Sequence, residues 1–304
     1  MERKDQLTGH LTALVTVFIW GTTFISTKVL LRSFSPLEIL FLRFLTGFLA
    51  LWVACPARLK VTDRKQEPYF AAAGLCGVTL YFLLENIALT YTLASNVGVI
   101  VSISPFLIAL MAHFFLDGEK LRAQFFAGFA VALSGIFLIS FNGSAVLQLN
   151  PAGDVLSVLA AVTWAIYSVL TRKISRFGYN TIQTTRRAFF YGLVFMLPTL
   201  LILDFGPEAA QLLAPVNFLN LLFLGLGASA MCFVTWGMAV RTLGAVKTGV
   251  YIYAVPVITV VTSALILHEK ITGLAALGTV LTLAGLIISE SKRLPLPKKA
   301  MTHE

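Results

Sequence analysis

The stretch DGEKLRAQFFAGFAVALSG, residues 117–135, returns later in the chain as HEKITGLAALGTVLTLAG, residues 268–285. At one shift of 150 residues the matched positions are Glu119/Glu269, Lys120/Lys270, Gly128/Gly278, Leu133/Leu283 and Gly135/Gly285. A repeat of this length indicates a duplicated structural unit. Because the glycines recur on one helix face, both segments are expected to pack closely against another helix, within one chain or in a dimer.

The repeat continues upstream of these stretches. At a shift of 151 the matched positions are Gly74/Gly225, Ala88/Ala239, Ala94/Ala245, Gly98/Gly249, Pro105/Pro256 and Leu116/Leu267. At a shift of 144 they are Gly9/Gly153, Trp20/Trp164, Thr27/Thr171 and Arg43/Arg187, with Lys28 on Arg172. We therefore expect a first repeat over residues 9–141, a second over 152–290, and a basic tail over 291–304.

The composition is that of a membrane protein. Of the 304 residues 58% are hydrophobic and 12% charged, whereas a soluble domain has about 25% charged residues. The mean hydropathy is +0.86. Apolar runs of the roughly 20 residues that cross a bilayer occur at 10–31, 36–55, 69–92, 94–116, 122–140, 153–171, 181–203, 218–240, 245–267 and 272–290. The sequence thus predicts an all-α integral membrane protein with ten transmembrane helices.

Five helices in each repeat, an odd number, predict that the second repeat is inserted upside down relative to the first. The loops on the amino-terminal side hold seventeen Lys and Arg residues, whereas the opposite loops hold only Arg32 and Lys270. Since basic residues concentrate in cytoplasmic loops, both termini are expected in the cytoplasm. The net charge of +9 therefore reflects topology, and no nucleic-acid partner is expected.

Several of these motifs resemble a known family. WGTTFISTK at residues 20–28, Arg43 early in the second helix, and the pair of stretches quoted first are similar to the two EamA repeats of the drug/metabolite transporter (DMT) superfamily. The resemblance covers about residues 9–290 and implies a ten-helix transporter of small organic solutes, often an exporter of amino acids or related metabolites, with a central cavity. The second copy differs, having Ala165 where the first has Gly21, and Arg172 for Lys28.

Polar and aromatic residues recur at helical spacing on the first and sixth helices. These stripes are Thr16, Trp20, Thr23 and Thr27, and Ala160, Trp164, Tyr167 and Thr171. Tyr81 and Glu85 on the third helix and Trp236 on the eighth extend them. The substrate-binding residues predicted from the sequence are Trp20, Thr23, Tyr81, Glu85, Ser102, Trp164, Tyr167, Trp236 and Tyr253. The alternative is ordinary packing between helices.

Pro105 and Pro256 lie near the middle of the fourth and ninth apolar runs, where each frees the carbonyl four residues earlier, at Val101 and Ile252. Ser102 and Tyr253 precede the prolines at equivalent positions and could satisfy these carbonyls or present them to a solute. We therefore predict that Pro105 and Pro256 form hinges, with a simple kink as the alternative.

Three ionisable residues are expected at similar depth in the outer third of the membrane, namely Lys28, Arg43 and Glu85. A charge in the bilayer requires a reason, so Glu85 is predicted to pair with Arg43 or Lys28 beside the pathway. The alternatives are a purely structural ion pair and a Lys28 side chain that reaches the outer surface.

In the second half the equivalent bases are Arg172 and Arg187, beside Arg186, and Trp236 stands where the first half has its carboxylate. No acid is therefore expected to face these bases. They should extend to the cytoplasmic surface, or alternatively form an inner mouth that attracts carboxylate-bearing solutes.

The function predicted is secondary transport by alternating access at a midplane cavity. No nucleotide-binding or hydrolase motif occurs, and Cys55, Cys76 and Cys232 have no metal-site spacing, so no catalytic residue, cofactor or metal is expected. The alternative is a membrane enzyme acting on a lipid or prenyl substrate. Expected partners are the small-molecule substrate and the lipid bilayer, for a monomer in the inner membrane of a bacterium; proton exchange and facilitated diffusion are both left open, so protons are one candidate partner. Substrate, direction and coupling are not fixed by the sequence.

Overall fold

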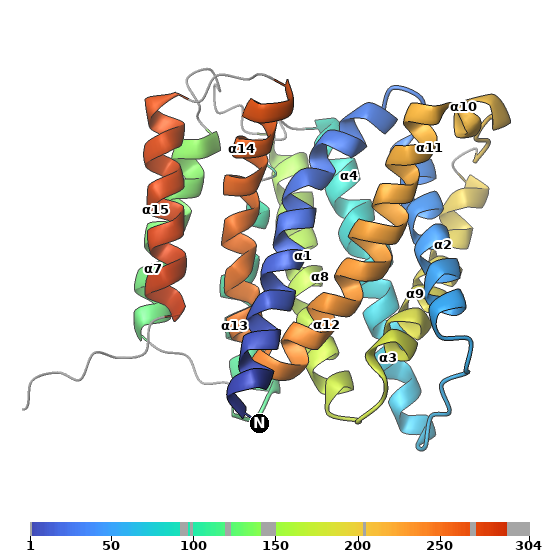
Figure 1. Ribbon diagram of the computed structural model, residues 1–304, viewed down its shortest axis with the longest axis horizontal. Helices are drawn as coiled ribbons and strands as arrows, with labels where there is room; N and C mark the ends of the chain where they lie inside the picture. The colour runs from blue at the N-terminus through green and yellow to red at the C-terminus, as the bar shows by residue number, and fades with distance from the viewer. Residues whose placement is uncertain are drawn as a thin grey trace, which may run out of the picture.

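Figure 1 shows the computed structural model of the chain, a bundle of helices that lie roughly parallel and antiparallel to one another. The structure describes residues 2–91, 97, 100–118, 123–140, 150–202, 205–267 and 272–290, without a few side chains, that of Lys28 among them. The predicted basic tail, residues 291–304, lies outside the described residues. Every regular element in the described ranges is helical, which confirms the all-α class.

The helices of the first half are α1 (Glu2–Leu30), α2 (Pro36–Ala54), α3 (Glu67–Gly74), α4 (Tyr81–Tyr91), α6 (Ser104–Phe115) and α7 (Ala123–Ser140). A 3₁₀ turn, Arg64–Gln66, precedes α3, and a π-helical segment, Leu75–Leu80, joins α3 to α4. Sequence signals explain the helix starts. At α2, Ser35 and Glu38 form a reciprocal capping box around Pro36.

The helices of the second half are α8 (Pro151–Ser175), α9 (Thr181–Ile202), α10 (Ala209–Leu213), α11 (Pro215–Leu222), α12 (Cys232–Leu243), α13 (Ala245–Val250), α14 (Ala254–Leu267) and α15 (Gly273–Glu290). A π-helical segment, Phe223–Met231, joins α11 to α12, and a 3₁₀ turn, Tyr251–Tyr253, joins α13 to α14. Asn150 caps α8, and Gly244, whose φ is +94°, separates α12 from α13.

Seven helical segments of the described chain are long and apolar enough to cross a membrane. They are Asp5–Thr27, Pro36–Ala54, Arg64–Ala88, Pro151–Ser175, Thr181–Ile202, Pro215–Leu243 and Ala245–Thr262. Three shorter apolar helices, Ser104–Phe115, Ala123–Ile139 and Gly273–Ser289, fall in the remaining predicted runs. The chain is therefore a multi-pass membrane protein, and the count of ten spans stays a prediction.

Equivalent helices of the two halves make equivalent contacts, each with the opposite half. Helix α1 packs against α12 and α14, while α8 packs against α4 and α6. Likewise α2 packs on the π-helical segment of the second half, and α9 on that of the first. Helices α1 and α8 run in opposite directions through the bundle (Figure 1). This exchange is the arrangement expected of an inverted repeat.

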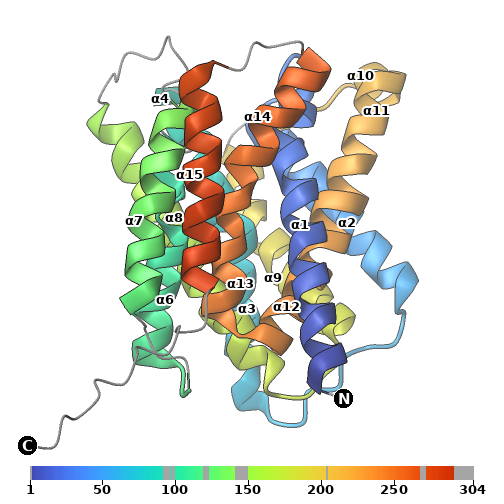
Figure 2. The same cartoon turned by 60° about the vertical axis from the view of Figure 1, so that its left-hand side comes forward.

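Helices α7 and α15 lie side by side at one edge of the bundle (Figures 1 and 2). A Cβ atom on Gly135 would lie 2.5 Å from the Gly278 carbonyl oxygen, and one on Gly285 would lie 2.6 Å from that of Gly128. Only glycine permits this approach. The close packing expected from the repeated glycines therefore joins the two halves of one chain.

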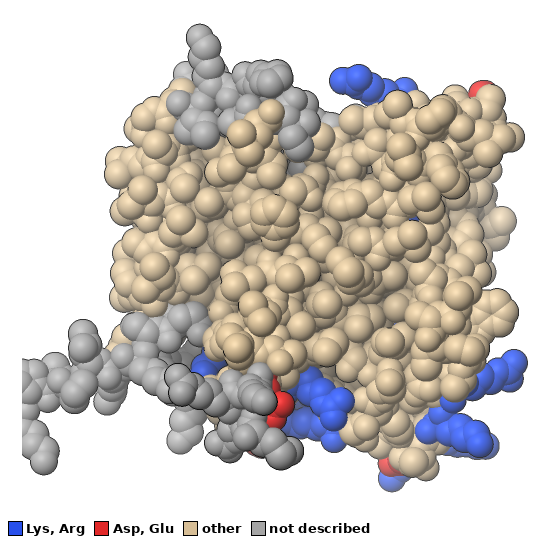
Figure 3. Space-filling model, in the orientation of Figure 1, with Lys and Arg blue, Asp and Glu red and all other residues tan. Residues whose placement is uncertain are grey.

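On the face that Figure 3 shows, charged side chains gather at the two ends of the molecule, and the wide band between them is almost free of charged side chains. One end, which we call the basic face, carries the amino-terminal end of α1 and most of the blue side chains in Figure 3. Its described bases include Arg58, Lys60, Arg64, Lys65, Arg172, Lys173, Arg176, Arg241 and Lys247.

Candidate functional site

Five of the predicted aromatic residues meet where α1, α4, α8 and α12 approach one another. We call these five and Phe233 the aromatic cluster: Trp20, Tyr81, Trp164, Tyr167, Trp236 and Phe233. Ring centroids are 5.4 Å apart for Trp20 and Trp164, 5.2 Å for Trp20 and Trp236, and 5.0 Å for Tyr81 and Trp164. Trp20 and Trp164 are the matched tryptophans of the two repeats, so the cluster lies at the junction of the two halves.

Two indole N–H groups of the cluster differ in whether they have a hydrogen-bond partner. The Trp20 Nε1–H donates to the Ala228 carbonyl at 3.1 Å. The Trp236 Nε1–H is fully buried and has no partner among the described residues. Leaving a buried donor unpaired costs about 1–3 kcal/mol. A solute that accepted this hydrogen bond would remove that cost.

Arg43 is 7% exposed and lies beside the cluster. Its Nε donates to the Ser229 Oγ at 3.0 Å, and its guanidinium lies 4.8 Å from the Phe82 ring centroid and 5.3 Å from that of Phe44. The two Nη atoms make no hydrogen bond to a described residue. The guanidinium thus lies against two aromatic rings, and its outer donors have no partner in the part of the chain that the structure describes.

Glu85 lies one turn after Tyr81, and the Tyr81 hydroxyl donates to its Oε1 at 3.2 Å. Its charge is attracted to that of Arg43, but the two side chains form no ion pair within 4 Å. The Lys28 side chain lies outside the described residues. The pairing of Glu85 with Arg43 or Lys28 therefore stays a prediction, with Arg43 the nearby described base.

The other predicted lining residues lie apart from the rings of the cluster. The Thr23 hydroxyl donates to the Trp20 carbonyl at 2.7 Å, within its own helix. Ser102 is buried in the turn before Pro105. Tyr253 is fully buried against Ala109 and Phe125, and its hydroxyl has no described partner. Their role in binding stays a prediction.

Both predicted hinges coincide with breaks in helix geometry. A turn at residues 102–103 precedes Pro105, and the 3₁₀ turn Tyr251–Tyr253 precedes Pro256. The carbonyl of Val101, freed by Pro105, accepts a hydrogen bond from the Ser104 hydroxyl at 2.6 Å. Ser104 thus bonds the carbonyl for which the sequence suggested Ser102. Movement about these breaks stays a prediction.

The expectation that no acid faces the bases of the second half is wrong for Arg187. Its Nε and Nη2 donate to the two carboxylate oxygens of Glu67 at 2.6 and 2.7 Å, and the Tyr191 hydroxyl also donates to Glu67. Glu67 begins α3, which packs against α9. The acid comes from the other repeat, so a comparison of equivalent positions does not find it.

The register of the second helices explains why Arg187 is not the counterpart of Arg43. A Cβ on Gly47 would meet the Gly225 carbonyl at 3.1 Å, and one on Gly192 would meet the Gly74 carbonyl at 3.2 Å. Gly74 and Gly225 are equivalent in the two repeats, so the glycines that meet them, Gly192 and Gly47, are equivalent too. The second helices of the two repeats are therefore related by a shift of 145 residues instead of 144. Arg43 therefore matches Ala188, and the second half has no cation at that position; its buried arginine on α9 is the neighbouring Arg186.

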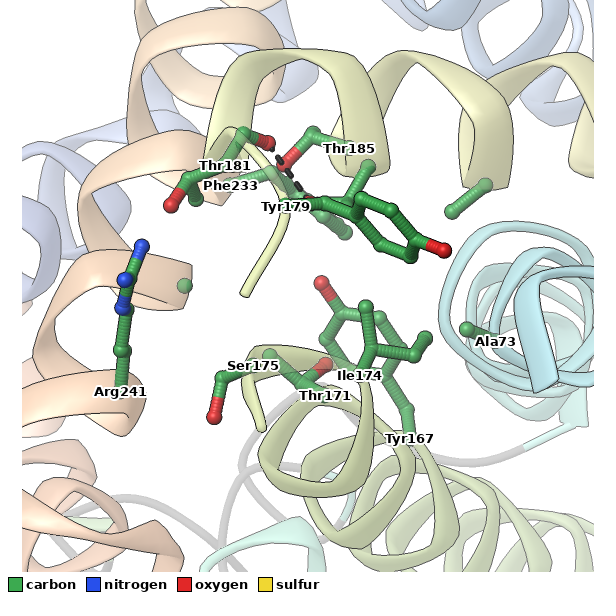
Figure 4. A pocket seen from close by; sticks show the side chains of 13 residues that line it. Ala73, Tyr167, Thr171, Ile174, Ser175, Tyr179, Thr181, Thr185, Phe233 and Arg241 are labelled. Atoms are coloured by element: carbon green, nitrogen blue, oxygen red, sulfur yellow. Dashed lines mark hydrogen bonds between the residues drawn. The ribbon is translucent and has the colours of Figure 1, made fainter. Parts of the chain in front are cut away.

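A cavity that the sequence analysis missed opens near the basic face (Figure 4). It is bounded by α3, α8, α9 and α12, and its lining includes Thr181, Thr185 and Arg241. Tyr167 and Phe233 of the aromatic cluster line it too. The sequence signal was weak, because these polar residues lie at helix ends, where such residues are common.

The sequence profile of the EamA-like transporter family matches residues 7–141 and 151–290. The chain belongs to the EamA-like transporter family. This membership makes it a membrane transporter and not an enzyme, as the motifs predicted, and it removes the lipid-enzyme alternative. The family match covers both halves of the bundle that meet at the aromatic cluster.

Several relatives match along nearly their whole length. An uncharacterised transporter of Archaeoglobus fulgidus is 28% identical, covering 93% of this chain and 98% of that protein. A protein of Streptantibioticus cattleyicolor named a probable terminal-alkyne amino-acid exporter is 28% identical, with 95% of each chain covered. A probable amino-acid metabolite efflux pump of Escherichia coli is 29% identical, again with 95% of each covered.

A solved crystal structure has the same fold. It superposes with a TM-score of 0.75 at 21% sequence identity and covers 93% of this chain and 96% of that one. At this identity the similarity establishes the fold alone.

Proposed function

We propose that this EamA-family transporter is a secondary exporter of amino acids or closely related metabolites, with the aromatic cluster, Arg43 and Glu85 as its central binding site. The observation that carries the proposal is the buried Arg43 guanidinium, whose Nη atoms bond to none of the described residues while Glu85 lies nearby without an ion pair to it. The names of the Streptantibioticus and Escherichia coli relatives support the same class of solute.

A zwitterion matches the charges of this site. Its carboxylate would accept from the free Nη atoms of Arg43, a geometry that favours two parallel hydrogen bonds. Its ammonium group would lie against Glu85. A buried charge without a partner is strongly destabilising, and an added partner offsets that desolvation. Binding therefore gives each of the two charges a partner. A singly charged analogue would leave one of them without a partner, and a neutral analogue would leave both.

The rings of the cluster provide the apolar part of the site. Trp20, Trp164 and Trp236 present faces and edges that suit aromatic or apolar side chains. The Trp236 Nε1–H adds one unsatisfied donor for a polar atom of the solute. The cluster is closed in this structure, since Trp164, Tyr167 and Trp236 are all buried, so a solute would enter when the two halves move apart.

The proposal includes membrane orientation and mechanism. The basic face is cytoplasmic, with both termini on that side, ten helices span the inner membrane of a bacterium, and the protein works as a monomer. The inverted halves move against each other about the breaks at Pro105 and Pro256, and this alternates access to the cluster. Protons are the candidate coupling ion, because Glu85 is a carboxylate at the site.

The test is counterflow in proteoliposomes that hold the purified full-length chain. Labelled aromatic and aliphatic amino acids are compared with matched amides and deaminated acids, with and without a pH gradient. We expect saturable counterflow of at least one amino acid, with both single-charge analogues transported about tenfold less well. Absence of counterflow for the whole panel, from protein that melts cooperatively, would refute the proposal.

A further inference from the structure

The cavity at the basic face reaches inward to the aromatic cluster. Tyr167, inside α8, and Phe233, at the start of α12, line its inner part, and Ser175 and Arg241 line it nearer the basic face (Figure 4). It has room for only a few water molecules. It is therefore a narrow passage between the surface and the proposed central site, enclosed by α3, α8, α9 and α12.

Arg241 is the available cation of this passage. The other arginines of the neighbouring helix ends are engaged with backbone or acid groups: Arg172 with Val240 and Arg241 carbonyls, Arg176 with Asp117, Arg186 with Ala57, and Arg187 with Glu67. The Arg241 side chain is exposed and makes no hydrogen bond or ion pair with a described residue. Its guanidinium extends along the wall formed by α12 (Figure 4).

Two hydroxyl groups complete a set of donors. Thr181 and Thr185 lie one turn apart on α9 and line the same cavity, and neither hydroxyl bonds to another described residue. Thr181 is also the first residue of α9, a helix of 22 residues, whose amino-terminal end carries about half a positive charge. The guanidinium and the two hydroxyls favour an anion. The dipole of α9 adds to them, while the backbone N–H groups of Ile182 and Gln183 already donate to the Asn180 Oδ1.

The first repeat has no equivalent of this site. At the repeat shifts established by the structure, Arg241 matches Thr90, while Thr181 and Thr185 match Pro36 and Leu40. At these equivalent positions the first repeat therefore has no cation in place of Arg241 and no hydroxyl in place of Thr181 or Thr185. The inverted symmetry is broken at the point where a solute would approach the cluster from the basic face.

We infer that Arg241, Thr181 and Thr185 form a loading site that captures the carboxylate group of solutes arriving from the basic face. The inference rests on the proposed function for the identity of the solute. It makes binding asymmetric, because carboxylates are selected on one side of the membrane and released on a side that has no such site. Solutes without a carboxylate lose this first contact.

A cysteine in the passage reports on the site without any transport. Ser175→Cys, in a background with Cys55→Ser, is modified from the basic face by anionic and by cationic methanethiosulfonate reagents. We expect the anionic reagent to react faster, and Arg241→Gln to lower the ratio of the two rates about tenfold. The matched control is Lys247→Gln, which removes an exposed charge of the same face that does not line the cavity; it should leave the ratio unchanged.

Protection of the same cysteine from a neutral reagent tests for carboxylate binding. L-Phenylalanine and phenylacetate should protect it, whereas L-phenylalaninamide should not. Arg241→Gln should raise the half-protecting concentration about tenfold and Thr185→Val about threefold. A rate ratio unchanged by Arg241→Gln, or equal protection by the amide, would overturn the loading site. Transport of the probes is measured in parallel, so loss of counterflow with protection intact would instead refute the proposed function.

Discussion

Arg43 is a cation that the fold buries without a direct acid partner, and its replacement is the sharpest test at the scale of single residues. We predict that Arg43→Gln and Arg43→Lys each abolish counterflow, because lysine lacks the planar fork by which Nε bonds Ser229 while both Nη atoms face a carboxylate. Arg43→Gln with Glu85→Gln should recover the melting temperature lost in either single variant, since no uncompensated charge remains, but should not recover transport.

The control for this experiment is Arg32→Gln, which removes an exposed base from the loop between α1 and α2. It should leave both counterflow and melting unchanged. Wild-type counterflow in the Arg43→Gln variant would contradict a binding role and would favour a structural role for this cation.

The sequence predicted side chains correctly where their position depends on the face of their own helix. It failed where the partner of a side chain comes from a neighbouring helix. Trp20 and Trp164 were predicted to line one site because each repeats on its own helix, and the structure brings their rings together. The partner of Arg187 depends on which helix end packs beside α9, and no motif near Arg187 indicates that this is the start of α3 with Glu67. For the same reason the sequence did not indicate Arg241. Its guanidinium stands out only because the neighbouring arginines are bonded to carbonyl or carboxylate groups.

At the scale of helices, the apolar runs of the sequence coincide with the helices that the structure describes. The π-helical segments were not predictable, since Leu75–Leu80 and Phe223–Met231 read as ordinary apolar helix. They occur at equivalent positions of the two repeats, each packed against the second helix of the other half. The extra residue of a π-bulge shifts the face that follows it, so this packing, rather than local propensity, selects the geometry.

The contact between α7 and α15 gives a second prediction. Gly135→Ala places a methyl group 2.5 Å from the Gly278 carbonyl oxygen, so the helices must separate. We expect the free energy of unfolding to fall by about 1–3 kcal/mol, measured by thermal melting in detergent. Gly273→Ala, where a Cβ meets nothing within 4 Å, is the control and should be neutral or slightly stabilising. Equal melting of both variants would contradict the contact.

The breaks before Pro105 and Pro256 give a third prediction. Alanine restores a backbone donor that competes with Ser104 for the Val101 carbonyl, so the broken helix should straighten and stiffen. We expect Pro105→Ala and Pro256→Ala to lower the maximal rate of counterflow several-fold with little change in KM. Pro198→Ala is the control, because α9 passes through Pro198 without a break. A change in KM alone would contradict a hinge.

At the scale of the whole molecule, alternating access requires contacts between the halves that form in one state and break in the other. The Thr16 and Thr235 hydroxyls, 2.6 Å apart, join α1 of the first half to α12 of the second. Both helices also carry tryptophans of the aromatic cluster. If the halves separate to admit a solute between Trp20 and Trp236, this contact must open.

A disulfide at that position should therefore arrest transport. We predict that Thr16→Cys with Thr235→Cys, in a background with Cys232→Ser, crosslinks under mild oxidation, because the two side chains are within disulfide reach. Counterflow should then fall to the background rate and return on reduction, while each single cysteine variant keeps its activity under the same oxidant. A fully crosslinked protein with unchanged counterflow would mean that α1 and α12 move as one body, and the opening to the cluster would then have to lie between α8 and α4, the corresponding contact of the inverted half.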